Sequence, residues 1–228
     1  MGIQSEIIDG IGHIRVDRPE KANAYDRAHL VALRDAIATL RASTSVVIIS
    51  STSDRVFCAG ADLDEMKQAT PEDARNLLSQ AVFTEIARSP VVSIAAVDGA
   101  AVAGGFELAL AADLRVIGAD ATFRLPETRL GIIPAAGGST RLTGLLGASV
   151  AKQVILGGED ITAAQAVAWG LGREGGDDAL AVATRWAEQI RETSPEARSA
   201  AKRIIDQAAE DASLLAERTA QAALYAKR

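Results

Sequence analysis

Cysteine and histidine are scarce in this chain of 228 residues, which has one cysteine, Cys58, and two histidines, His13 and His29. A single cysteine cannot form an internal disulfide, and so few soft ligands make a structural zinc site improbable. We therefore expect a protein of a reducing compartment that binds no metal.

Two kinds of segment are also missing. The N-terminus has no basic stretch followed by an apolar one, so we recognise no secretory signal and expect a cytoplasmic location. The most apolar run, residues 91–112, contains Asp98 and Glu107, and each acid would cost about 2.5–3.5 kcal/mol at the centre of a bilayer. We therefore expect no association with a membrane.

Positive charge is in deficit as well. The net charge is −6, whereas a protein that binds nucleic acid needs a basic face to neutralise phosphates. Nucleic acid is therefore not the expected partner. The rest of the composition, with 48% hydrophobic and 24% charged residues, is that of a globular protein long enough to bury one sizeable core.

The order of the predicted elements indicates an α/β fold. Residues 3–17 alternate apolar and polar side chains, which predicts a hairpin, and Asp26 can cap the helix that follows. The continuous apolar runs 46–50 and 91–97 predict strands covered on both faces, and one helix is predicted over 70–86 between them. Strands that alternate with helices indicate a mainly parallel sheet.

Beyond about residue 135 the pattern predicts helices with few further strands. We therefore expect a core over residues 1–190 and a C-terminal helical region over 191–228. Residues 170–175 match the spacing of a dinucleotide-binding fingerprint, but a predicted helix precedes them where that motif needs a strand. We interpret this glycine-rich segment as a loop.

Two segments rich in glycine and alanine, 57–63 and 98–108, follow the two buried strands. Open α/β sheets bind ligands where parallel strands end, and small side chains let a ligand approach the backbone closely. A helix is predicted to begin at Gly104 and Gly105, where unpaired amides favour an anion. Two converging amides would form an oxyanion hole; the alternative is that the glycines only permit close packing of strand and helix.

Two carboxyl groups complete this pattern. Glu107 lies in the first turn of the predicted helix, where the helix dipole should lower its pKa. Glu127 follows Pro126 in a more apolar setting that should raise its pKa, although Arg124 and Arg129 act in the opposite direction. Two carboxyls with separated pKa values suit acid–base catalysis. The alternatives are that Glu107 is only an acid at the start of a helix and that Glu127 only caps the next turn.

Taken together, these segments resemble the crotonase, or enoyl-CoA hydratase/isomerase, superfamily. The resemblance rests on Val16-Asp17-Arg18-Pro19 with Asn23-Ala24, and on residues 57–66, 90–107 and 123–142. It implies the ββα-spiral fold, a coenzyme A thioester as substrate with no separate cofactor, and homotrimers or dimers of trimers. It also implies that 191–228 is a shortened trimerisation region, because the chain ends before the basic final helix of many relatives.

The same resemblance implies roles for individual residues. The amides of Ala61 and Gly104 would hold the thioester carbonyl, and Glu107 and Glu127 would be the two catalytic acids of a 2-enoyl-CoA hydratase. The remaining contacts with substrate or coenzyme A would come from Lys21, Ala22, Ala59, Gly60, Asp62, Leu63, Asp64 and Gly105.

Besides its shortened C-terminal region, this sequence departs from the family pattern in two further places. Residues 170–177 replace an apolar strand and a turn that contains proline, and Asp64 stands where relatives often have lysine. The alternatives in the same fold are an enoyl-CoA isomerase and an enzyme like carnitinyl-CoA dehydratase. A non-enzymatic scaffold or RNA-binding homologue is a further alternative, for which Arg27, Arg34 and Arg41 could form a basic strip on one helix.

Overall fold

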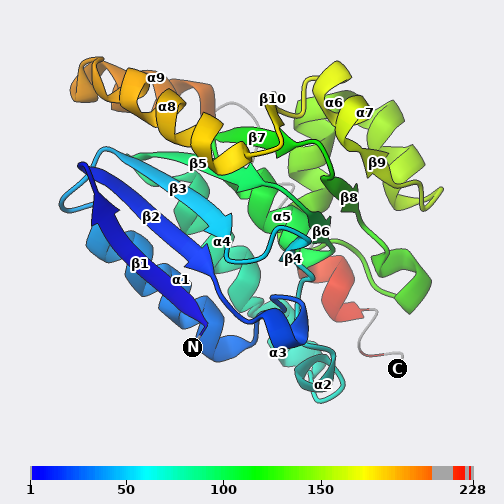
Figure 1. Cartoon of the computed structure of the whole chain (residues 1–228). Helices are drawn as coiled ribbons and strands as arrows, with labels where there is room; N and C mark the ends of the chain where they lie inside the picture. Colours follow the sequence, from blue (N-terminus) through cyan, green and yellow to red (C-terminus); the bar gives the residue numbers. More distant parts are fainter. Residues whose placement is uncertain (1, 207–217, 224–225, 227–228) are drawn as a thin grey trace.

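A computed structural model describes residues 2–206, 218–223 and 226, and contains two β-sheets with helices packed against them (Figure 1). The larger sheet has six strands in the order β1-β2-β3-β5-β7-β10. The β1–β2 pair is antiparallel and the other pairs are parallel, which confirms the predicted hairpin and α/β class. The strands are β1 (Ile3–Ile8), β2 (Ile11–Val16), β3 (Val46–Ser51), β5 (Val92–Val97), β7 (Leu114–Gly118) and β10 (Arg173–Gly176).

The smaller sheet has four short strands in the order β4-β6-β8-β9, and only the last pair is antiparallel. Its strands are β4 (Val56–Cys58), β6 (Ala100–Val102), β8 (Thr122–Arg124) and β9 (Ile161–Thr162). Each of β3, β5 and β7 in the large sheet is followed by a strand of the small sheet and then by helix. This repeated ββα unit brings the ends of β4 and β6 together, because those strands are paired neighbours.

Helices cover both faces of the large sheet. One face packs against α8 through three alanines, Ala179, Ala183 and Ala187, and the other packs against α1, α4 and α5. The helices are α1 (Arg27–Leu40), α2 (Leu63–Met66), α3 (Pro71–Arg75), α4 (Leu78–Ala87), α5 (Gly104–Ala111), α6 (Gly138–Ile155), α7 (Ala163–Ala168), α8 (Ala179–Arg191) and α9 (Pro195–Asp206), with 3₁₀ helices η1 (Pro19–Lys21) and η2 (Glu127–Leu130). Residues 218–223 are also helical. No helix within these described ranges is long and apolar enough to cross a membrane.

The cap predicted at Asp26 is present, but the helix predicted over 70–86 is interrupted. The Asp26 carboxylate accepts a hydrogen bond from the His29 amide at 3.0 Å and so begins α1. Thr70 and Asp73 form a reciprocal capping box at the start of α3. The chain then leaves helical geometry at Asn76 and Leu77, so the segment forms two helices.

The interpretation of residues 170–175 as a loop is wrong over its second half. Residues 173–176 form β10, which pairs in parallel with β7. A Cβ at Gly172 would lie 2.6 Å from the Arg115 carbonyl oxygen, and one at Gly175 would lie 3.0 Å from Ala179. These glycines therefore let an edge strand fit between β7 and α8. Backbone hydrogen bonds to β7, rather than buried apolar side chains, hold this strand in the sheet.

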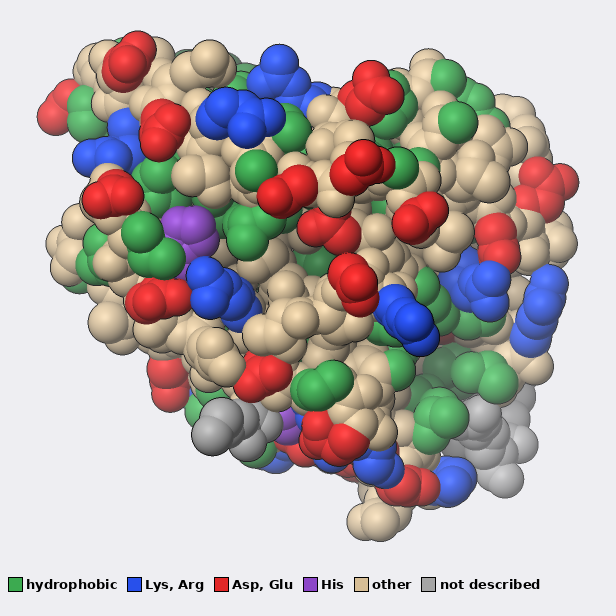
Figure 2. Space-filling view, in the orientation of Figure 1, with side chains coloured by type: hydrophobic (Ala, Val, Ile, Leu, Met, Phe, Trp, Pro, Cys, Tyr) green, Lys and Arg blue, Asp and Glu red, His purple; other side chains and the backbone are tan. Residues whose placement is uncertain are grey.

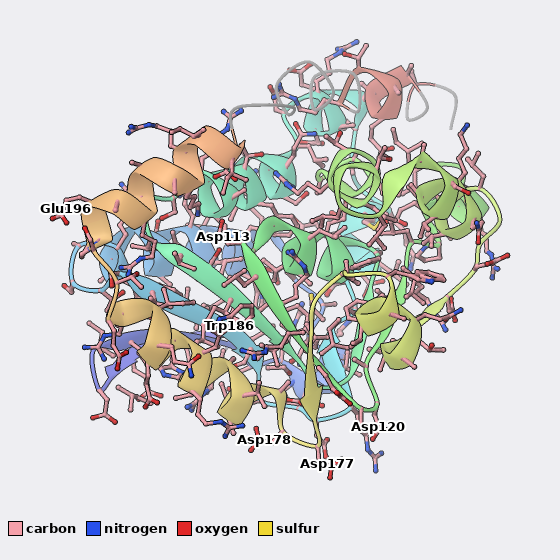
Figure 3. The ribbon with its side chains drawn as sticks, turned by 90° about the horizontal axis from the view of Figure 1, so that it is seen from above. Asp113, Asp120, Asp177, Asp178, Trp186 and Glu196 are labelled. Carbon is pink, nitrogen blue, oxygen red and sulfur yellow. The ribbon has the colours of Figure 1, made fainter. Side chains whose placement is uncertain are left out.

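The described part of the C-terminal region is tied to the core by a partly buried ion pair. Lys202 of α9 contacts Asp113, which Figure 3 labels, at 2.7 Å and donates to the Val91 carbonyl oxygen at 3.0 Å. Asp113 also accepts from the amide and hydroxyl of Ser93. The helical region predicted over 191–228 is found in part. Helix α9 spans Pro195–Asp206 and residues 218–223 are helical, whereas the prediction for residues 207–217 lies outside the described residues.

Candidate active site

A cavity of about 540 Å³ opens beside the ends of β4 and β6 and contains the residues in which the sequence predicted chemistry. Ala61 and Gly104 line it together with Glu107 and Glu127. Ala61 comes from the loop after β4, Gly104 and Glu107 come from α5, and Glu127 comes from η2. Its wall is mostly apolar and includes Leu77, Val102, Leu130, Ile132, Ile133 and Ala136. Apolar walls of this kind exclude water, so they strengthen electrostatic contacts with a bound molecule.

The loop after β4 is held in place by the backbone of Tyr25. The Tyr25 amide donates to the Gly60 carbonyl oxygen and the Asp62 amide donates to the Tyr25 carbonyl oxygen, each at 2.8 Å. These bonds leave the Ala61 amide between them without a protein acceptor among the residues described. Gly60 has φ of +92°, and a Cβ there would lie 3.0 Å from the Gly104 nitrogen, so the two loops are in close contact.

The Gly104 amide opens α5 and also has no protein acceptor within the described residues. Ala103, directly before it, has φ of 51° and ψ of −126°, a region that residues with a Cβ rarely adopt. Gly105 packs so tightly that a Cβ would lie 1.9 Å from the Cys58 carbonyl oxygen. Gly105 therefore permits close packing, as one interpretation of the glycine-rich segment predicts, while Gly104 lines the cavity, where the oxyanion-hole interpretation places it.

Glu107 lies in the first turn of α5, as predicted, and is buried. Its Oε1 accepts hydrogen bonds from the Ala136 and Gly138 amides, both at 2.8 Å. Since Gly138 is the first residue of α6, this carboxyl also satisfies amides at the start of a second helix. The carboxyl group is therefore fixed in one orientation at the cavity wall.

Glu127 is 5% exposed, and its Oε2 has no hydrogen-bond partner among the described residues. Burial raises the pKa of this carboxyl from 4.5 to about 7, because removal from water disfavours the ionised form. The apolar setting therefore outweighs Arg124 and Arg129, whose guanidinium groups are directed to Asp160 and to the Gly158 carbonyl. A buried carboxyl that can hold a proton near neutrality is suited to act as a general acid.

We expect the Glu127→Gln variant to be more stable than the natural chain at pH 8 and nearly equal to it at pH 4.5. The folded chain retains the Glu127 proton up to a pH of about 7, whereas the unfolded chain loses it near 4.5. The free energy of unfolding of the natural chain therefore falls as pH rises through that range, whereas glutamine does not ionise and the variant is spared this loss. The difference should reach about 3 kcal/mol at most, at roughly 1.4 kcal/mol per pKa unit. Urea unfolding at both pH values measures it, and a difference independent of pH would contradict the raised pKa.

We expect Gly104→Ala to lower activity at least tenfold. The added Cβ would lie 1.9 Å from the hydroxyl oxygen of Tyr25, whose buried ring is packed edge-on against Phe83 and cannot move away freely. Gly144→Ala in α6 is the matched control, because nothing lies within 4 Å of its Cβ and alanine favours a helix by up to about 1 kcal/mol. Steady-state kinetics and thermal unfolding of both variants check this, and equal activities would contradict it.

The structure brings nine of the twelve predicted site residues to this cavity: Lys21, Ala59, Ala61, Asp62, Leu63, Asp64, Gly104, Glu107 and Glu127. Ala22, Gly60 and Gly105 do not line it. Ala22 instead accepts a hydrogen bond from the Ala59 amide at 3.1 Å, and so supports the loop from behind.

Charged side chains surround the mouth of the cavity. Asp64 contacts Lys21 at 3.2 Å and Lys67 at 3.0 Å, and Arg18 contacts the Asp62 carboxylate at 3.0 Å. Asp64 thus places a negative charge between two lysines where relatives often have another lysine. On the face in Figure 2, acidic and basic side chains are interspersed.

Three cavity residues with uncharged polar side chains are among those not predicted from the sequence: Tyr25, Ser79 and Gln221. Gln221 comes from the last described helical segment and accepts a hydrogen bond from the Ile133 amide at 3.0 Å. Tyr25 directly follows Asn23-Ala24, one of the segments on which the resemblance rests, and its polar side chain at that place was the available signal. Ser79 and Gln221 carry no such signal, because only the tertiary fold brings them to the cavity.

Residues 6–228 match the family model described as enoyl-CoA hydratase/isomerase. The chain is 40% identical over 207 residues to the probable enoyl-CoA hydratase 2, mitochondrial, of Arabidopsis thaliana, a match that covers 88% of this chain and 69% of that protein. It is 42% identical over 166 residues to the Bos taurus enoyl-CoA hydratase domain-containing protein 2, mitochondrial, a match that covers 71% of this chain and 56% of that protein. It is also 36% identical over 211 residues to human methylglutaconyl-CoA hydratase, mitochondrial, covering 88% and 62%.

The matches thus cover little more than half of the cow protein and about two thirds of the other two. All three names place those proteins in mitochondria, so the cytoplasmic location stays a prediction for this chain.

Solved structures show the same likeness over nearly the whole chain. The enoyl-CoA hydratase from Bacillus anthracis has a TM-score of 0.86 at 31% identity, covering 99% of this chain and 90% of that one. The enoyl-CoA hydratase/isomerase from Xanthobacter autotrophicus Py2 has a TM-score of 0.88 at 30% identity, covering 98% and 87%. With the repeated ββα units, this likeness confirms the fold predicted from the sequence.

Proposed function

This chain belongs to the enoyl-CoA hydratase/isomerase family, and from that premise we propose that it adds water reversibly across the 2,3 double bond of a 2-enoyl-CoA thioester. The observation that carries the proposal is that one cavity is lined by two buried carboxyls and by two residues whose amides have no protein acceptor among the described residues. Hydration needs both kinds of group, because charge develops on the thioester oxygen while two protons are transferred.

The Ala61 and Gly104 amides are the proposed oxyanion hole. Donors that await the charge of the transition state stabilise it without reorganising, and each one contributes about 3–4 kcal/mol in enzymes where one was removed. A thioester oxygen bound between them polarises the conjugated double bond, so that its β carbon becomes electrophilic. Lys21 and Lys67, at the mouth of the cavity, are placed to meet the phosphates of the coenzyme A moiety.

The two glutamates have complementary roles in this proposal. Glu107 orients the water and takes its proton as the water oxygen bonds to the β carbon. The electron pair of the double bond moves toward the thioester oxygen, which the two amides stabilise. Protonated Glu127 then gives its proton to the α carbon, which completes a 3-hydroxyacyl-CoA thioester. In the reverse direction the same groups remove water.

A panel of 2-enoyl-CoA thioesters that differ in chain length and branching tests the proposal. Hydration removes the conjugated double bond, so the ultraviolet absorbance of the enoyl thioester should fall only when active protein is present. The reverse assay starts from the 3-hydroxyacyl thioester and should restore that absorbance. Conversion of a 3-enoyl thioester to a 2-enoyl thioester with no hydration would overturn the proposal in favour of the isomerase alternative.

We also propose that the chain forms homotrimers or dimers of trimers, as the resemblance implies. Sedimentation equilibrium measures this directly. A monomer at all concentrations would contradict it.

A further inference from the structure

Gln80, a buried residue of α4, donates a hydrogen bond to the loop between η2 and α6. It is 3% exposed, and its Nε2 donates to the Ala135 carbonyl oxygen at 2.6 Å. Ala135 and its neighbour Ala136 line the catalytic cavity, whereas Gln80 does not. Gln80 therefore supports the cavity wall from behind, and it can affect a bound molecule only through the groups of that wall.

The peptide group that Gln80 contacts is the one that holds Glu107. The Ala135 carbonyl and the Ala136 amide are the two ends of a single planar peptide group. The carbonyl accepts from Gln80, and the amide donates to Glu107 Oε1 at 2.8 Å. A donor on the carbonyl polarises the peptide group and strengthens the hydrogen bond that its N–H makes. Gln80 therefore fixes the plane of this peptide and the direction of the N–H that holds the carboxyl.

The rest of this loop is held without Gln80. The Gly138 amide donates to the same carboxyl oxygen at 2.8 Å, and the Gly137 carbonyl of that peptide group accepts from the Arg141 amide at 2.8 Å. The Arg141 guanidinium also donates to the Ala136 carbonyl oxygen at 2.9 Å. Since α6 supplies these bonds, loss of the Gln80 donor should loosen one peptide group and leave the loop in place.

We propose that Gln80 is a positioning residue, which aligns the Glu107 carboxyl for proton transfer through the peptide group between Ala135 and Ala136. This inference rests on the proposed function, in which Glu107 takes a proton from the attacking water. A base must lie within hydrogen-bond reach of that proton, and a misplacement of about 1 Å can cost on the order of a hundredfold in rate. Because Gln80 does not line the cavity, its loss should lower turnover and leave substrate binding unchanged.

Gln80→Met tests this positioning, because it removes the donor and keeps a side chain of similar volume. We expect kcat for crotonyl-CoA hydration to fall about tenfold and KM to change by less than about twofold. In the Glu107→Gln background the same substitution should lower the residual rate by less than about twofold, because no base remains to be positioned. Gln80→Asn keeps the amide but withdraws it by one methylene, so it should show the same losses and serves if Gln80→Met does not fold.

Ser93→Ala is the matched control for lost stability. It removes a buried hydroxyl that is hydrogen-bonded to Asp113 and does not line the cavity. Thermal unfolding should show that Ser93→Ala and Gln80→Met are both less stable than the natural chain, whereas only Gln80→Met should lose turnover. A comparable loss of kcat in Ser93→Ala would attribute the effect to stability and overturn the assignment.

An NMR measurement provides a readout that does not depend on turnover. The Ala136 amide proton is hydrogen-bonded to a carboxyl oxygen and should therefore resonate downfield. Gln80→Met and Glu107→Gln should each move this resonance upfield, because each weakens the same hydrogen bond, whereas Ser93→Ala should leave it in place.

The remaining outcomes distinguish this assignment from the proposed function. A kcat of Gln80→Met within about twofold of the natural value overturns the assignment, and so does a loss that simply multiplies with that of Glu107→Gln, because Gln80 would then act independently of the base. If the natural chain hydrates no 2-enoyl thioester, the proposed hydration fails. The Ala136 resonance then decides alone: movement in both variants supports the contact through the peptide group, and an unmoved resonance overturns it.

Discussion

Glu127→Gln should lower the rate of crotonyl-CoA hydration at least about a hundredfold, the scale expected when a general acid is lost. Glutamine has the shape of the protonated side chain but gives no proton to the α carbon. Because Oε2 of Glu127 has no partner among the described residues, the exchange should disturb little else. Substrate affinity should therefore change far less than turnover.

The pH dependence of the natural chain provides an independent check. Burial raises the pKa of Glu127 to about 7, and the proposed acid must be protonated to act. The rate constant kcat/KM should therefore fall as pH rises through about 7, toward a tenfold loss per pH unit. The residual activity of Glu127→Gln should lack this descending limb. Turnover of the variant close to the natural rate, or an unchanged limb, would remove Glu127 from the mechanism.

Glu107→Gln should also lower hydration at least about a hundredfold, for a different reason. The glutamine oxygen can still accept the hydrogen bonds that the Ala136 and Gly138 amides donate to Oε1, so the wall of the cavity should keep its shape. An amide cannot take a proton from water, so base catalysis should be lost. Glu107→Ala is the contrasting variant. It leaves buried amides unpaired and should cost about 1–3 kcal/mol of stability per donor in addition to activity.

The same variant separates two chemistries of this family. An isomerase that only shifts a double bond should retain conversion of 3-enoyl to 2-enoyl thioesters without Glu107, whereas a hydratase should lose its activity. Parallel assays of both reactions with Glu107→Gln and Glu127→Gln therefore identify the reaction. Loss of isomerisation but not hydration in Glu107→Gln would contradict the role proposed for this carboxyl.

The sequence predicted the parts of the fold whose pattern is local. β3 and β5 are continuous apolar runs buried on both faces, and the caps at Asp26 and Thr70 begin the helices that were expected. The strands of the small sheet were not predicted, because each has only two or three residues and exists through pairing with neighbours. Periodicity is not measurable over so short a run.

The site shows the same division. Glycine-rich segments after strands and two acids predicted the residues that line the cavity, since strand ends meet at one edge of a sheet. Tyr25 and Ser79 come together only through the contact between the loop before α1 and the start of α4, which no spacing in the sequence encodes. The raised pKa of Glu127 likewise depends on burial by distant residues.

The geometry of β10 bears on how this edge of the sheet tolerates sequence drift. Gly172 and Gly175 are confined by atoms of β7 and α8, whereas Arg173 and Glu174 are exposed. At positions 172 and 175, selection should act on side-chain volume rather than on hydrophobicity, so that only glycine is accepted. Homologous chains can vary more widely at the exposed positions 173 and 174. Random substitutions at 172 and 175 should therefore destabilise the chain far more than substitutions at 173 and 174.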